Sequence, residues 1–140
     1  MAEQNQPMIE ARVRIIHGAM LVATIAVPVI LAVVRVTVGQ TGTEEPARLL
    51  ATIVPVVALL TIIVSLTLRK RIPARTGTMS QGDWWTVNMR TAVVLWSLAE
   101  GTGMLAGVAY FLTGHLPATL LAFGVAVALL LMSSPGRLAE

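Results

Sequence analysis

Two ionisable side chains, Glu100 and His17, lie within the long apolar stretches of this 140-residue sequence. If the apolar stretch at 92–112 crosses a bilayer, Glu100 lies roughly 3 Å from the midplane. A charged side chain at that depth costs roughly 2.5–3.5 kcal/mol and usually faces a partner or a water-filled cavity. Glu100 is therefore the principal candidate for a proton or cation site, or for a polar contact that joins two helices.

The residues around Glu100 recur at helical spacing. Steps of four and three residues connect Trp96, Glu100, Gly103, Gly107, Tyr110 and Gly114, which places them on one face of a helix. Gly103 and Gly107 form a GxxxG pair, and small residues at this spacing let two helix backbones approach closely in lipid. We therefore expect helix packing at Gly103 and Gly107, with Glu100 directed at a neighbouring helix.

The expected depths of the polar residues suggest two interhelical contacts. Thr61 lies about 4 Å from the midplane and so is level with Glu100, whereas Ser65 and His17 both lie about 10–11 Å from it. The sequence thus predicts a polar contact between Glu100 and Thr61 and another between His17 and Ser65. His17 also fits a simpler role at the membrane interface, because it follows Arg14 by about one helical turn.

The sequence lacks the patterns of most catalytic and metal-binding sites. It has no cysteine, and its two histidines, His17 and His115, fall at opposite ends of the expected spans, where they could not share a haem. No phosphate-binding loop, catalytic triad, carboxylate pair or dinucleotide fingerprint is present. We therefore expect no enzyme activity, no cofactor and no metal.

The elements that must position these residues follow from the composition. Hydrophobic residues make up 56% of the chain and charged residues only 12%, whereas about 25% are charged in ordinary globular domains. So small a chain could not bury that much apolar surface in water. We predict one integral membrane domain over 1–140, an all-α four-helix transmembrane bundle of two hairpins. Its expected spans are 15–34, 49–68, 92–112 and 117–133.

The connectors carry signals for turns and helix starts. Residues 39–42 and 114–117 are expected to form the turns within the two hairpins. The third helix is expected to begin before the membrane, because Ser80 and Asp83 are both plausible N-caps. Trp84 and Trp85 would then lie at the level of the lipid headgroups.

The basic residues predict the orientation. One end of the expected bundle carries Arg12, Arg14, Arg69, Lys70, Arg71, Arg75, Arg90 and Arg137, and the other end carries only Arg35 and Arg48. This bias predicts a multi-pass protein of the inner (plasma) membrane with both termini in the cytoplasm. The net charge of +3 does not indicate nucleic-acid binding, because the basic residues flank apolar stretches and form no continuous stripe.

The second hairpin resembles small bacterial four-helix membrane proteins, most of which have no assigned function. The resemblance covers about a third of the chain and depends on Arg90, the stretch 98–101, Gly107, the stretch 112–114 and Pro135. The acid with nearby glycines is also similar to rotary ATPase proteolipid subunits, and Ala99-Glu100-Gly101-Thr102 to small multidrug resistance transporters. However, the first span lacks the proteolipid glycine repeat, and the transporters carry their acid in the first helix.

Two functions from different classes remain. The first is a non-enzymatic subunit of a larger membrane complex, or a partner in a homo-oligomer, in which Glu100 is a polar contact between helices. The alternative is a proton-coupled transporter or ion-pathway component in which Glu100 carries the proton. The two are separated by whether Glu100 opens to a polar cavity or is enclosed by Thr61 and the glycines.

Overall fold

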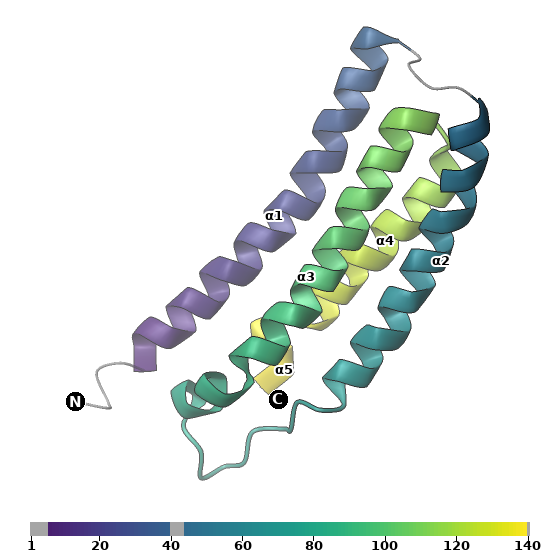
Figure 1. Ribbon diagram of the computed structural model, residues 1–140. Coiled ribbons are helices and arrows are strands. Elements are labelled where there is room, and N and C mark those ends of the chain that lie inside the picture. Colours follow the sequence, from purple (N-terminus) through teal and green to yellow (C-terminus); the bar gives the residue numbers. More distant parts are fainter. Residues whose placement is uncertain (1–5, 40–43, 140) are drawn as a thin grey trace.

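The computed structural model describes residues 6–39 and 44–139, and every regular element in that part of the chain is a helix. The elements are α1 (Gln6–Val38), α2 (Glu44–Arg69), α3 (Gln81–Thr113), α4 (Leu116–Met132) and the short α5 (Pro135–Ala139). The four long helices lie side by side as a bundle, with α1 and α3 running in one direction and α2 and α4 in the other (Figure 1). The predicted all-α class is confirmed.

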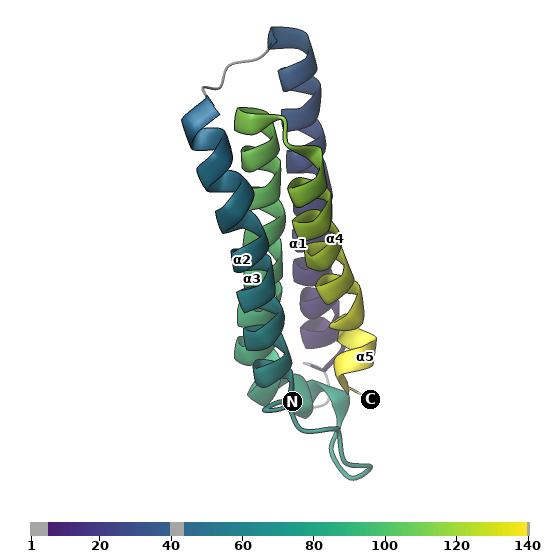
Figure 2. The same ribbon diagram turned by 90° about the vertical axis from the view of Figure 1, so that its right-hand side faces the viewer.

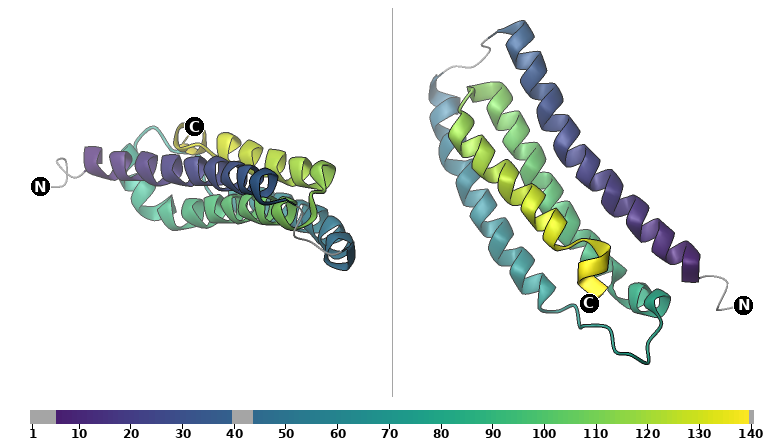
Figure 3. Two further views of the ribbon diagram at one scale, coloured as in Figure 1. Left: turned by 90° about the horizontal axis from the view of Figure 1, so that it is seen from above. Right: turned by 180° about the vertical axis from the view of Figure 1, so that it is seen from behind.

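Helix α3 occupies the centre of the bundle. It lies between α1 and α2, and α4 packs across the same three helices from behind (Figures 1 and 2). The views from above and from behind in Figure 3 show the same arrangement. Because α3 contacts α1, α2 and α4, it contributes more side chains to the core than any other helix. Three of the largest fully buried side chains belong to it, namely Trp84, Trp85 and Trp96.

The core changes in character along the axis. Toward the end where α1 begins, it is built around aromatic and branched residues: Val13, Ile72, Trp84, Trp85, Ala92, Leu95, Trp96, Ala99, Leu130 and Leu138. Toward the other end it consists mainly of small residues: Val54, Ala58, Ala106, Ala109 and Ala122. Small side chains allow α2, α3 and α4 to pack closely there.

Local sequence explains where α3 begins and ends. The Ser80 side chain accepts a hydrogen bond from the Asp83 backbone N–H at 3.1 Å, so Ser80 is the N-cap, as expected. At the other end Gly114 adopts a left-handed conformation, with φ of 68°, and its N–H donates to the Tyr110 carbonyl at 2.8 Å. Glycine adopts this conformation without steric cost. The chain can therefore turn directly into α4, whose first turn contains Pro117.

The surface of the bundle is rich in large apolar side chains. Large apolar side chains are exposed along its length, including Ile15 at 69% and Val36 at 79%. Only 6% of the most apolar stretch of α1 is buried inside the protein. In the described residues three helices, α1, α2 and α3, are long and apolar enough to cross a membrane, whereas α4 is apolar but shorter, at 17 residues. Contiguous apolar surface on this scale is rare in soluble monomers.

The two tryptophans at the start of α3 and the turn expected at 39–42 compare with the sequence prediction as follows. Trp84 and Trp85, which were expected at the headgroup level, are buried inside the bundle and are each only 1% exposed. They pack edge to face at 4.7 Å, and the Trp84 indole donates to the Pro73 carbonyl at 2.9 Å, so they seal the end of the bundle from inside. The turn expected at 39–42 lies, apart from Gly39, outside the described residues.

Candidate functional site

The GxxxG pair of α3 packs against α1. A Cβ built on Gly103 would lie 2.6 Å from the Thr24 side chain, and one built on Gly107 would lie 2.8 Å from Cα of Pro28. The two glycines therefore allow the α1 and α3 backbones to approach, which is the packing role expected of them. The expected contact of Glu100 with Thr61 would have placed this face against the second helix, whereas its glycines meet α1.

Thr61 of α2 contacts α3, but at Thr102 and not at Glu100. The two hydroxyl oxygens are 2.7 Å apart and both side chains are buried. Because the Thr102 hydroxyl donates to the Leu98 carbonyl, its oxygen accepts from Thr61. The level of Thr61 along the bundle axis was predicted nearly correctly, since its partner Thr102 is only two residues from Glu100. The expected face was wrong, because two residues correspond to about 200° of rotation around a helix.

Glu100 lies on the flank of α3, beyond the contact with α1. Its side chain is half-buried, and it has no hydrogen bond or ion pair with any described residue. Its neighbours on the outer side, Ser97 and Gly101, are exposed. A Cβ built on Gly101 would meet nothing within 4 Å. Glu100 is therefore neither enclosed by Thr61 and the glycines nor paired with a described residue, and two small exposed residues, Ser97 and Gly101, lie beside it.

His17 of α1 binds the end of α4 rather than Ser65. Its Nε2 lies 3.0 Å from the Leu130 carbonyl oxygen, so this nitrogen carries the hydrogen and donates it. The imidazole also meets the Trp96 ring edge to face at 5.0 Å. Trp96 Nε1 in turn donates to the Ser133 carbonyl at 2.7 Å. The last carbonyls of a helix lack partners within it, and here side chains from α1 and α3 supply them.

The sequence contained a signal that the end of α4 needs hydrogen-bond donors from other helices. Pro135 has no N–H group, so α4 cannot continue through it, and its final carbonyls must find other donors. The indole of Trp96 is such a donor, although its spacing in the sequence indicated only that it shares a face with the glycines. Identifying the pair would have required knowing that α4 runs back alongside α3 to the level of His17.

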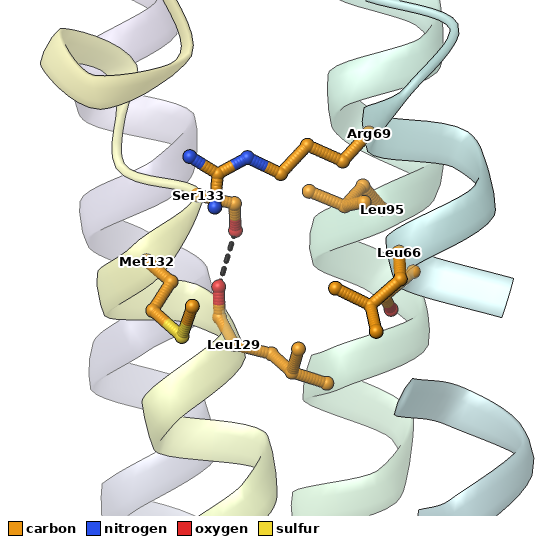
Figure 4. A pocket seen from close by; sticks show the side chains of 7 residues that line it. Leu66, Arg69, Leu95, Leu129, Met132 and Ser133 are labelled. Atoms are coloured by element: carbon orange, nitrogen blue, oxygen red, sulfur yellow. Dashed lines mark hydrogen bonds between the residues drawn. The ribbon is translucent and has the colours of Figure 1, made fainter. Parts of the chain in front are cut away.

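Ser65 is buried with its hydroxyl unpaired among the described residues, at 2% exposure. It lines a cavity of about 20 Å³ between α2 and α4, together with Leu66, Arg69, Leu95, Leu129, Met132 and Ser133. Figure 4 shows the Arg69 side chain extending from α2 toward Ser133 at the end of α4. The Ser133 hydroxyl is already engaged, since it donates to the Leu129 carbonyl. The predicted contact of Ser65 with His17 is not formed.

A related arrangement at the opposite end of the bundle involves Arg35. Its guanidinium donates to the Phe111 carbonyl in the last turn of α3 and lies over the Tyr110 ring, 5.7 Å from the centroid. It also lies against Gly114, where a side chain would collide with it. In the sequence Arg35 stands out only as one of two basic residues at its end of the bundle. No local motif distinguishes such a residue from an ordinary interfacial arginine.

The polar side chains described above form contacts between helices. Within residues 6–39 and 44–139 no group of three or more His, Cys, Asp or Glu side chains could hold a metal ion. Searches against protein-family models, curated proteins and solved structures found no match for the chain. The function must therefore be inferred from the residues themselves, and chiefly from Glu100.

Proposed function

We propose that this chain is a non-enzymatic inner-membrane protein that assembles with a further transmembrane helix through the outer flank of α3. The partner is a second copy of the chain or another subunit of a membrane complex. The observation that carries the proposal is Glu100, an acid in the middle of α3 that is half-buried and has no partner among the described residues. An acid near the bilayer centre is costly unless a partner receives it.

The neighbouring surface suits a helix partner. Ser97 and Gly101 are four residues apart, both are exposed, and they flank Glu100 on its outer side. Small residues at this spacing permit close approach of a second helix, and a polar group at such a contact adds a hydrogen bond. A partner helix seated there would remove Glu100 from lipid and provide it with a donor.

The proposal includes four transmembrane helices with both ends in the cytoplasm. At 17 residues α4 is about 26 Å long, slightly less than the roughly 30 Å of a hydrocarbon core. The start of α1, the α2–α3 connector and α5 all lie at one end of the bundle (Figure 1), and most of the basic residues belong to these segments. The positive-inside rule supports a cytoplasmic location for that end.

Single-cysteine labelling tests the orientation, because the chain contains no cysteine of its own. In intact cells an impermeant thiol reagent should modify His115→Cys, and it should modify Gly77→Cys only after the membrane is opened. Both positions are exposed, so accessibility within the fold does not bias the comparison. Labelling of Gly77→Cys in intact cells would contradict the proposed orientation.

Cross-linking tests the assembly. Ser97→Cys and Gly101→Cys, oxidised in native membranes or treated with a short thiol cross-linker, should give a defined higher-mass product. Leu60→Cys is the matched control: it is exposed on α2 at 54% and should give none. Glu100→Gln should change the product little, because a neutral amide also donates and accepts hydrogen bonds. A chain that is monomeric in mild detergent and gives no product at either position would refute the proposal.

The same Glu100→Gln variant separates the proposal from proton transport. In proteoliposomes the assembly function predicts equal proton leakage for the parent protein and the variant. If the parent carried a proton flux that vanished in a folded Glu100→Gln variant, Glu100 would be a transport residue, because glutamine cannot release a proton.

A further inference from the structure

A cavity at the basic end of the bundle joins two arginines from different helices. It has a volume of about 160 Å³ and is lined by Arg69, Ile72, Ala74, Arg137 and Leu138. Arg69 ends α2 and Arg137 belongs to α5, so the cavity lies between two separate helices. We propose that it binds the phosphate of an anionic phospholipid headgroup.

The chemistry of the lining favours an anion. Two arginines line the cavity, and none of its described lining residues is acidic. Neither arginine forms an ion pair or a hydrogen bond with any described residue. Guanidinium groups bind phosphate through paired hydrogen bonds, and two of them converging from separate elements form a clamp. A zwitterionic headgroup is disfavoured, because its own cationic group would also face the arginines.

The position of the cavity favours a lipid over a free phosphate ion. Arg69 stands in the last turn of α2, where a membrane-spanning helix reaches the headgroups. The rest of the lining is apolar, and both Ile72 and Leu138 are buried residues of the core. On the membrane side Arg69 also borders the smaller cavity that contains the unpaired hydroxyl of Ser65, four residues earlier on α2 (Figure 4). Basic pockets of this kind between helices at the cytoplasmic surface bind anionic headgroups.

The rest of the basic cluster provides a matched control. Lys70 and Arg71 follow Arg69 directly, yet both are exposed and neither lines the cavity. If only the general positive charge attracted lipid, removing Lys70 and Arg71 would matter as much as removing Arg69 and Arg137. If the cavity binds the headgroup, only the second pair should matter.

The experiment measures lipid binding to the full chain in detergent by native mass spectrometry, with phosphatidylglycerol, phosphatidylcholine and soluble glycerol 3-phosphate as probes. We expect phosphatidylglycerol to bind at least about tenfold more tightly than phosphatidylcholine. Arg69→Gln with Arg137→Gln should remove about tenfold in affinity, and Lys70→Gln with Arg71→Gln less than about threefold. Equal losses in the two double variants would overturn the proposal.

Two further arms make the result decisive. If glycerol 3-phosphate binds as tightly as the lipid and displaces it, the site recognises a free phosphate compound and the lipid assignment is wrong. If the Arg69 and Arg137 variant does not fold, Ala74→Phe fills the cavity while keeping both arginines. Ala74→Phe should reduce phosphatidylglycerol binding, and unchanged binding would refute the site. None of these measurements involves Glu100, so the lipid site and the assembly function fail or succeed separately.

Discussion

The contact between Gly103 and Thr24 allows the packing of α1 on α3 to be tested by a single methyl group. A methyl added at Gly103 would lie 2.6 Å from Cγ2 of Thr24, well inside the roughly 3.5–4.0 Å at which carbon atoms pack. Thr24 cannot simply rotate away, because its hydroxyl donates to the Met20 carbonyl at 2.8 Å. We therefore predict that Gly103→Ala destabilises the bundle and that Thr24→Ser, which deletes Cγ2 but keeps the hydroxyl, rescues it.

The expected change in the free energy of unfolding is a balance between the cost of overpacking and the gain in helix propensity. Overpacking of a tight interior costs about 1–3 kcal/mol, and alanine regains about 1 kcal/mol over glycine in a helix, so Gly103→Ala should cost roughly 0–2 kcal/mol. Thr24→Ser alone should cost about 0.5–1.5 kcal/mol for the lost methyl. In the double variant the collision is gone, and the nearest remaining contact is Cβ of Ala126 at 3.3 Å. We expect a favourable coupling energy of about 1–2 kcal/mol.

Gly107 and Gly124 provide the controls. At Gly107 the new methyl would meet Cα of Pro28 at 2.8 Å, which is backbone. Gly107→Ala should therefore be destabilising, and Thr24→Ser should not rescue it. At Gly124 the added methyl meets nothing within 4 Å. Gly124→Ala should be neutral or stabilising by up to about 1 kcal/mol.

Unfolding by sodium dodecyl sulfate in mixed micelles measures these energies, with the fluorescence of the three buried tryptophans as the signal. The reasoning fails if the coupling between Gly103→Ala and Thr24→Ser is below about 0.5 kcal/mol, the usual error of additivity. It also fails if Thr24→Ser rescues Gly107→Ala to the same extent, because the rescue would then be unspecific.

The same unfolding assay checks three further predictions. Trp96→Phe keeps an aromatic side chain but leaves the Ser133 carbonyl without its donor and part of the indole volume empty, and should cost at least about 1–3 kcal/mol. A silent change would contradict the buried contact. Thr61→Val should cost only about 0.6 kcal/mol, because Thr102 retains its bond to the Leu98 carbonyl; a loss above 2 kcal/mol is not expected. Gly114→Ala should cost at least about 1–2 kcal/mol, since φ there is 68°, and equality with Gly124→Ala would contradict this.

The helical elements could be predicted from the sequence because a long apolar stretch that crosses a membrane must pair its own backbone N–H and C=O groups, as a helix does. Each expected apolar stretch lies within one of α1 to α4, apart from the last residue of the fourth, Ser133, which caps α4. Ser80 and Gly114 also cap α3 as their residue types indicate. These features are local, and each depends on residues within a few positions of one another.

The contacts between helices were less predictable, because they depend on which helices are neighbours. Depth along the axis follows from counting residues, so the Thr61 contact was predicted at nearly the correct level. Rotation about the axis is far more sensitive, since one residue turns a helix by about 100°. The packing face of Gly103 and Gly107 was identified correctly, but its partner could not be, because GxxxG specifies close approach and not the identity of the second helix.

The placement of α1 shows why polar residues near helix ends matter in this bundle. Lipid is as apolar as the side chains of α1, so no hydrophobic force holds α1 at a given height against α3. His17 and Arg35 are 18 residues apart, about 27 Å along the helix. One donates to the last turn of α4 and the other to the last turn of α3. A shift of α1 by one turn would remove both donors from carbonyls that lack partners within their own helices. The small residues of α3 therefore determine how closely α1 approaches, and these two side chains determine its height.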